Sequence, residues 1–98
     1  MTATPSAVEV VLEPDAQRYV LRVDGKEIGF AEAVVRGDAV VFPHTVVRPE
    51  ERGKGWAEEL VGRALDDVRA RGLRVVPACW YVRQFIEAHP EHQDLLAG

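Results

Sequence analysis

The chain has 98 residues, of which 47% are hydrophobic, so it has enough apolar surface for one small core and is not expected to be disordered. Its formal net charge of −4 argues against binding to nucleic acid or to an anionic membrane surface. No apolar run approaches the roughly 20 residues that cross a bilayer, the N-terminus lacks a signal-peptide pattern, and the single cysteine excludes an internal disulfide. We therefore expect a cytoplasmic protein with no nucleic-acid or membrane partner.

The first half of the chain has the pattern of four strands in a single domain that spans residues 1–98, with 1–6 as a flexible tail. Alternating valine and leucine side chains predict the first strand within 8–14, and Asp24-Gly25 suits a tight primed turn between the next two. The fourth strand is expected over Ala39–Val47. Pro43 inside it cannot donate to a ladder, which predicts a bulge or an edge nearby.

Helical spacing of apolar residues from Trp56 to Val68 predicts an amphipathic helix that ends near Gly72. The apolar segment 73–77 is expected to form a fifth, central strand. The segment 80–92 is expected to contain a second helix, which stops before Pro90. Four strands, a helix, a strand and a helix predict an α+β (α/β) fold with a strand–helix–strand crossover. In the second helix we expect Tyr81, Phe85 and Ile86 to face inward. Its aromatic residues, including Trp80, should belong to the core or to the wall of a cleft, and His89 and His92 should be solvated.

The segment RPEERGKG stands where the fourth strand gives way to the helix. A helix N-terminus presents unpaired N–H groups and the positive end of the helix dipole, and glycines let an anion approach that backbone. Arg52 and Lys54 add positive charge. Glu50 and Glu51 would oppose an anion, so we expect both of them to point outward. Taken alone, Gly53 and Gly55 are better explained by a glycine-rich strand-to-helix connection with solvated charges.

The wider context of this loop supports the anion site. RGKGWA fits Arg/Gln-x-x-Gly-x-Gly/Ala with Arg52, Gly55 and Ala57 at the fixed places, and it resembles the coenzyme A pyrophosphate loop of the GCN5-related N-acetyltransferases. A His-Thr start to the loop strand, a Pro-x-Cys after the next strand and a helix ending in His-Pro are similar to the small, truncated members of that family. The resemblance implies a minimal version of the family fold, with a mixed, mostly antiparallel five-stranded sheet and two main helices.

The resemblance also implies acetyl-CoA as the acetyl donor, an unidentified amine as the acceptor, and a monomer or homodimer. The pantetheine arm of acetyl-CoA would run along Thr45, Val46 and Val47, where the fourth and fifth strands must move apart to admit it. The pyrophosphate would lie on the loop beside the Arg52 side chain. The loop residues that would carry it are Gly53, Lys54, Gly55, Trp56 and Ala57.

Two residues are candidates for the chemistry. Cys79 follows the fifth strand and could protonate the leaving thiolate or attack the thioester, although most lone cysteines only fill space. His44 could act as a general base, or it could satisfy backbone groups at a bulge. The chain lacks helices between its first strands, and Phe85 and Ile86 stand where larger members often have a tyrosine acid, with Tyr81 placed early for that role. The alternative function is therefore an acyl-CoA-binding or protein-interaction module without turnover.

Overall fold

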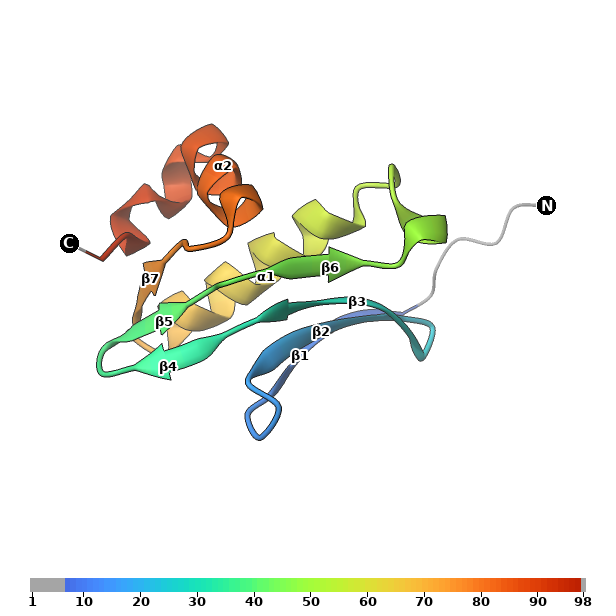
Figure 1. The fold of residues 1–98 in the computed structure, drawn as a ribbon, viewed down its shortest axis with the longest axis horizontal. Helices are drawn as coiled ribbons and strands as arrows, with labels where there is room; N and C mark the ends of the chain where they lie inside the picture. The colour runs from blue at the N-terminus through green and yellow to red at the C-terminus, as the bar shows by residue number, and fades with distance from the viewer. Residues whose placement is uncertain (1–6, 98) are drawn as a thin grey trace.

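The computed structural model describes residues 7–97, so the expected tail at 1–6 lies outside the described residues. Strands and helices follow one another much as the sequence indicated (Figure 1). The strands are β1 (Val8–Glu13), β2 (Arg18–Val23), β3 (Lys26–Glu32), β4 (Val34–Arg36), β5 (Ala39–Val41), β6 (Thr45–Val47) and β7 (Arg74–Val76). The helices are α1 (Trp56–Ala70) and α2 (Trp80–Ala88), with the 3-10 segments η1 (Pro49–Glu51) and η2 (Pro90–Leu95).

The strands form two sheets. β1, β2, β3 and β6 pair antiparallel in that order, and a second sheet holds β4, β5 and β7, with β5 and β7 parallel. The α+β class is confirmed, but the count of five strands was wrong. The expected third strand is divided at Ala33 and the expected fourth at Phe42–His44, so that five expected strands become seven.

The break in the expected fourth strand lies around Pro43. Before it, the Phe42 N–H donates to the Val76 carbonyl at 3.0 Å, and the Phe42 carbonyl accepts from the Cys79 N–H at 2.7 Å. After it, the His44 carbonyl accepts from the Glu32 N–H at 2.9 Å, and β6 continues along β3. The chain thus leaves β7 at Pro43, which has no N–H to extend that ladder. One edge of β6 is left without a strand beside it in the part of the chain that the structure describes.

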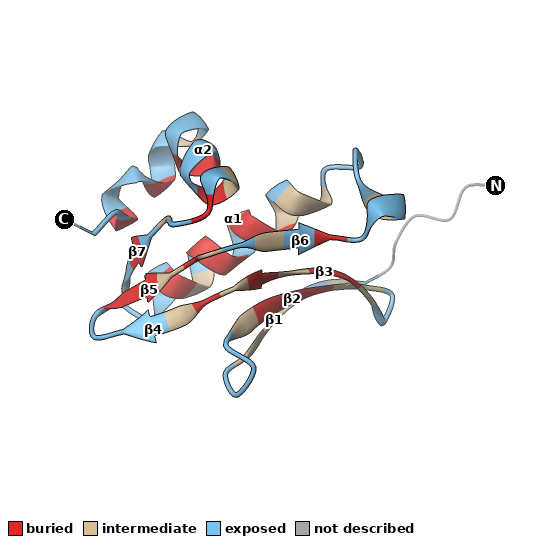
Figure 2. Ribbon diagram, viewed as in Figure 1, coloured by how far each residue is buried: buried red, intermediate tan, exposed pale blue. Residues whose placement is uncertain are grey.

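Helix α1 packs its apolar stripe on the sheets and supplies much of the core (Figures 1 and 2). Its buried residues, all at helical spacing, are Leu60, Val61, Ala64, Leu65 and Val68. On the solvent-exposed side of the helix Glu59 and Arg63 form an ion pair at 2.7 Å. Gly72, with φ +72°, follows the last helical turn and donates to the Arg69 carbonyl, so the predicted helix end is confirmed.

Helix α2 differs in part from its prediction. Phe85 and Ile86 are buried as expected. Trp80 is 73% exposed and is outside the core, but it lines a hollow beside β6, which agrees with the other expectation, the wall of a cleft. His92 is 7% exposed, because η2 turns back and brings its ring within 5.7 Å of the Phe85 ring centroid. The expectation of a solvated His92 was therefore wrong. Within residues 7–97, no helix has the length and apolarity needed to cross a membrane.

Candidate functional site

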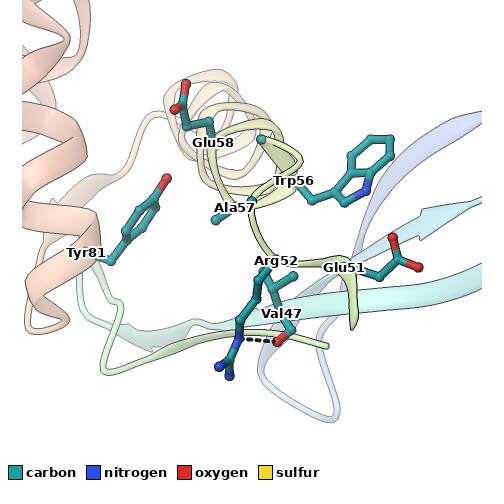
Figure 3. Close-up of a pocket in the computed structure, with 9 residues that line it drawn as sticks. Val47, Glu51, Arg52, Trp56, Ala57, Glu58 and Tyr81 are labelled. Atoms are coloured by element: carbon teal, nitrogen blue, oxygen red, sulfur yellow. Dashed lines mark hydrogen bonds between the residues drawn. The ribbon is translucent and has the colours of Figure 1, made fainter. Parts of the chain in front are cut away.

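A groove runs beside the open edge of β6, between this strand and the start of α2. Two adjoining hollows make it up, which we name the strand hollow and the loop hollow. The strand hollow, of about 330 Å³, is lined by Thr45, Val46, Val47, Arg52, Ala57, Cys79, Trp80 and Tyr81. The loop hollow is lined by Val47, Glu51, Arg52, Gly53, Gly55, Trp56, Ala57, Glu58 and Tyr81 (Figure 3). Nearly all of the expected coenzyme residues thus border one continuous groove.

The backbone of β6 presents polar groups to this groove. The His44 carbonyl accepts from Glu32, and the Arg48 N–H donates to Ile28 at 2.9 Å, so even-numbered residues direct their backbone groups at β3. Because these directions alternate along an antiparallel strand, the N–H and C=O groups of Thr45 and Val47 face the groove. The side chain of Val46 borders the strand hollow, whereas its backbone groups belong to the β3 ladder.

The glycine loop opens directly into helix α1. Gly53 and Gly55 have φ of +80° and +82°, a conformation that favours glycine, and Gly55 is the N-cap of the helix. A Cβ added to either glycine would meet no protein atom within 4 Å, so the space over the loop is open. The first N–H groups of the 15-residue helix α1 therefore border an accessible hollow, as an anion site requires.

The charged side chains around the loop have different roles. Arg52 donates from Nε to the Val47 carbonyl at 3.3 Å (Figure 3) and forms no ion pair within residues 7–97, so its remaining N–H groups are available in the groove. Lys54 pairs with Glu51 at 3.1 Å. Lys54 was expected among the coenzyme-binding residues, but its side chain does not line either hollow.

The expectation that both glutamates point outward was wrong for Glu51. Its side chain is only 16% exposed, and it borders the loop hollow beside Trp56 (Figure 3). The hydrogen bond from Lys54 holds the pKa of the Glu51 carboxyl below its usual range, so this group carries a negative charge at neutral pH. Glu50, by contrast, is 59% exposed near Arg48. Trp56 itself is half-buried and packs against the core, as expected.

The two candidate catalytic residues occupy different environments. Cys79 is the N-cap of α2, is 7% exposed, and has its Sγ atom 3.8 Å from Thr45 Oγ1. His44 lies just before β6 with its side chain 63% exposed, and its Nε2 is 3.1 Å from Glu32 Oε1. The structure therefore brings Cys79 to the strand hollow, while His44 is not among the residues that line it.

Tyr81 was expected in the core or in the wall of a cleft, too early in the helix to reach the reacting groups, and it proves to be a central residue of the groove. The helix begins at Trp80, so Tyr81 is in its first turn and reaches across the groove toward α1 (Figure 3). It lines both hollows. Burial, and secondly the negative charge of Glu58, raise the pKa of its phenol, which stays protonated at neutral pH. Its position two residues after Cys79 was the only available signal.

Histidines and carboxylates do not gather elsewhere into a metal site. In the described part of the chain, no group of three or more potential metal ligands is found. His89, expected at a solvated helix end, stacks on the Phe85 ring at 3.9 Å and contacts the Phe85 carbonyl through Nδ1 at 2.7 Å.

Comparison with known proteins shows the family of the chain. Residues 18–95 match the family described as GCN5-related N-acetyl-transferase. Protein NATD1 from Bos taurus is 40% identical over 103 residues, covering 95% of this chain and 89% of that protein. The Mus musculus protein of the same name is 33% identical over 101 residues, covering 93% of this chain and 90% of the mouse protein.

One solved structure confirms the fold. The ribosomal-protein-S18-alanine N-acetyltransferase from Escherichia coli superposes with a TM-score of 0.60 at 22% identity, over 72% of this chain. The superposition covers 49% of the bacterial enzyme, so the present chain corresponds to about half of it. On the evidence of the family match over residues 18–95 and of the NATD1 relatives, the chain belongs to the GCN5-related N-acetyltransferase family.

Proposed function

We propose that the protein binds acetyl-CoA in the groove beside β6 and transfers the acetyl group to an amine. The observation that carries this proposal is the continuity of the groove, which leads from Cys79 and the open edge of β6 to the glycine loop at the start of α1. An extended, amide-containing arm that ends in a pyrophosphate matches these surfaces in that order. Family membership supports the same reading.

Each part of the groove would hold one part of the donor. The backbone groups of Thr45 and Val47 face the groove and suit the amides of the pantetheine arm. The N–H groups from Gly53 to Ala57 suit the pyrophosphate, since they combine open approach with the positive end of a helix dipole. Arg52 adds a charge that no carboxylate within residues 7–97 neutralises. Trp56 lines the loop hollow and packs against the core, and Lys54 contributes only weakly because Glu51 pairs with it.

The chemistry requires a neutral amine, a polarised thioester carbonyl and a proton for the departing thiolate. Acetyl-CoA supplies the activated acetyl group. When the amine nitrogen bonds to the carbonyl carbon, the C–S bond breaks, the sulfur takes one proton, and the new amide nitrogen loses one. Cys79 borders the strand hollow through a thiol that bonds to Thr45, so it is our candidate for delivering the sulfur's proton. His44, which contacts Glu32, is our second candidate for the chemistry, as the base that accepts the amine proton.

A second candidate function, binding without turnover, is favoured by one observation. Among the described residues that line the strand hollow, none is a histidine or a carboxylate. The test measures release of free thiol from acetyl-CoA with a broad panel of amines, alongside titration calorimetry with coenzyme A. We expect both binding and amine-dependent release. Tight binding with no release from any amine would replace the transferase by an acyl-CoA-binding module, and absence of binding would remove both.

A further inference from the structure

Three hollows meet at the side chain of Tyr81. Beyond the strand hollow and the loop hollow, a third lies between α1 and α2, which we name the helix hollow. Its lining consists of Glu58, Tyr81, Gln84, Phe85, Ala88 and His89. Tyr81 is common to all three, whereas Cys79 borders only the strand hollow. A ligand that runs from Cys79 to the glycine loop would therefore lie along the Tyr81 side chain.

The side chain of Tyr81 points toward the start of helix α1. The ring extends from the first turn of α2 toward Ala57 and Glu58 in the first turn of α1 (Figure 3). Glu58 lines the loop hollow and the helix hollow but not the strand hollow. The phenol oxygen thus points toward the first turn of α1, at the end of the groove that holds the glycine loop (Figure 3).

We infer that the Tyr81 hydroxyl donates a hydrogen bond to a phosphate of the bound coenzyme, next to the N-terminus of α1, and that it is not the acid that protonates the thiolate. The inference rests on the proposed function and assigns a residue of the binding site within it. It also gives the phosphate a neutral donor on the side of the groove opposite the loop.

The chemistry of the phenol suits this role. Within residues 7–97 the hydroxyl has no hydrogen-bond partner, so it is available to a ligand. Its raised pKa keeps it in the donating form at neutral pH. The Trp80 ring meets the Tyr81 ring edge-on at 5.9 Å, which limits how the phenol can turn. Phosphate oxygens are strong acceptors, and a donor fixed in advance loses little entropy on binding.

Glu58 allows a second test of where the phosphate lies. This exposed carboxylate borders the same hollow as the phenol, and its charge contributes to the raised pKa of Tyr81. A phosphate at this place would be repelled by Glu58, so Glu58→Gln should tighten coenzyme A binding. Pantetheine, which has no phosphate, should bind the wild type and Glu58→Gln equally.

The main experiment compares Tyr81→Phe with the wild type on two ligands, coenzyme A by calorimetry and pantetheine by NMR titration. We expect the Kd for coenzyme A to rise about tenfold, or about 1.4 kcal/mol, and the Kd for pantetheine to stay unchanged. The kcat at saturating acetyl-CoA, and its pH profile, should not change. Tyr19→Phe is the matched control, because the Tyr19 hydroxyl bonds to Asp67 at 2.6 Å and lines none of the three hollows.

The outcomes separate this inference from the function on which it rests. If the wild type binds coenzyme A and Tyr81→Phe binds it equally well, the inference is wrong and the proposed groove stands. An equal loss for both ligands, or a fall in kcat at unchanged KM, would also overturn it, the latter in favour of an acid at the thioester. If the wild type binds neither ligand, the proposed function fails first.

Discussion

Replacing Gly55 by alanine separates the geometry of the ligand site from the stability of the fold. Gly55 has φ +82° and is the N-cap of α1, and a Cβ added there meets no protein atom within 4 Å. The substitution therefore causes no clash within the protein. Its cost to folding is the backbone strain of a side chain in the left-handed region, about 1–2 kcal/mol. For a domain of this size that lowers Tm by about 4–8 °C for each kcal/mol.

Gly25→Ala is the matched control for this strain. Gly25 has φ +84°, and a Cβ there also meets no atom within 4 Å, but it lies in the β2–β3 turn outside the groove. Both variants should lose similar stability. Only Gly55→Ala places a methyl group over the N–H groups on which a phosphate would lie, so we expect its Kd for coenzyme A to rise at least tenfold, or about 1.4 kcal/mol.

The assay is titration calorimetry at a temperature at which circular dichroism shows both variants to be folded. Thermal unfolding measures the strain in the same two samples. The reasoning is refuted if Gly55→Ala binds coenzyme A as tightly as Gly25→Ala does, because the phosphate then does not approach this loop. A loss of affinity in both variants would instead mean that reduced stability, and not the added methyl group, weakens binding.

Three further predictions concern charge, chemistry and acid stability. Added salt should weaken coenzyme A binding, since exposed charges are screened within about 10 Å at 0.1 M. In titrations at low and high salt, Arg52→Gln should lower both the affinity and its salt dependence, whereas Lys54→Gln should change little because the lysine is already paired with Glu51. Equal effects of the two substitutions would contradict this assignment. Cys79→Ser and Cys79→Ala should fold and bind coenzyme A but release thiol at least tenfold more slowly at saturating acetyl-CoA, a barrier change of about 1.4 kcal/mol; near-native turnover would leave Cys79 a packing role and make His44 the next residue to test. Burial acts to raise the pKa of Asp67, but hydrogen bonds from Arg71 and Tyr19 outweigh it and hold that pKa low. The ionised Asp67 therefore contributes its full stability above the carboxyl's unfolded-state pKa of about 3.9, and this stability is lost as the pH falls through the folded-state pKa. In urea unfolding at neutral and acid pH, Asp67→Asn should lose less free energy of unfolding on acidification than the wild type does.

Features encoded by a few neighbouring residues could be predicted from the sequence. Asp24 and Gly25 adopt φ of +50° and +84° in the expected primed turn, because the dipeptide alone tolerates that geometry. The α1 stripe and the glycines at its start are equally local. The family resemblance added the expected order of ligand parts along the groove, with the pantetheine arm at β6 and the pyrophosphate at the loop. No single motif indicated this order. The roles of the expected site residues stay predictions.

Features that depend on distant contacts could not be predicted in the same way. His92 is buried because η2 returns to Phe85, and the sequence around His92, which is rich in polar residues, gives no sign of this. Glu51 faces the groove, where Lys54 pairs with it and Trp56 borders the same hollow. Tyr81 reaches α1 only because α2 starts at Trp80 and crosses near the loop. Each of these depends on how two elements meet, which spacing along one element does not specify.

Pro43 explains why one edge of β6 has no strand beside it within residues 7–97. The ladder between β5 and β7 ends where the Phe42 carbonyl accepts the Cys79 N–H, and proline has no N–H with which to continue it. Beyond this point β6 stays with β3, and the backbone groups of Thr45 and the N–H of Val47 face the groove, where the Val47 carbonyl accepts from Arg52. Exposed strand edges invite unwanted pairing and are usually covered. An edge kept open beside the glycine loop therefore favours a ligand that supplies amide partners of its own, as the pantetheine arm does.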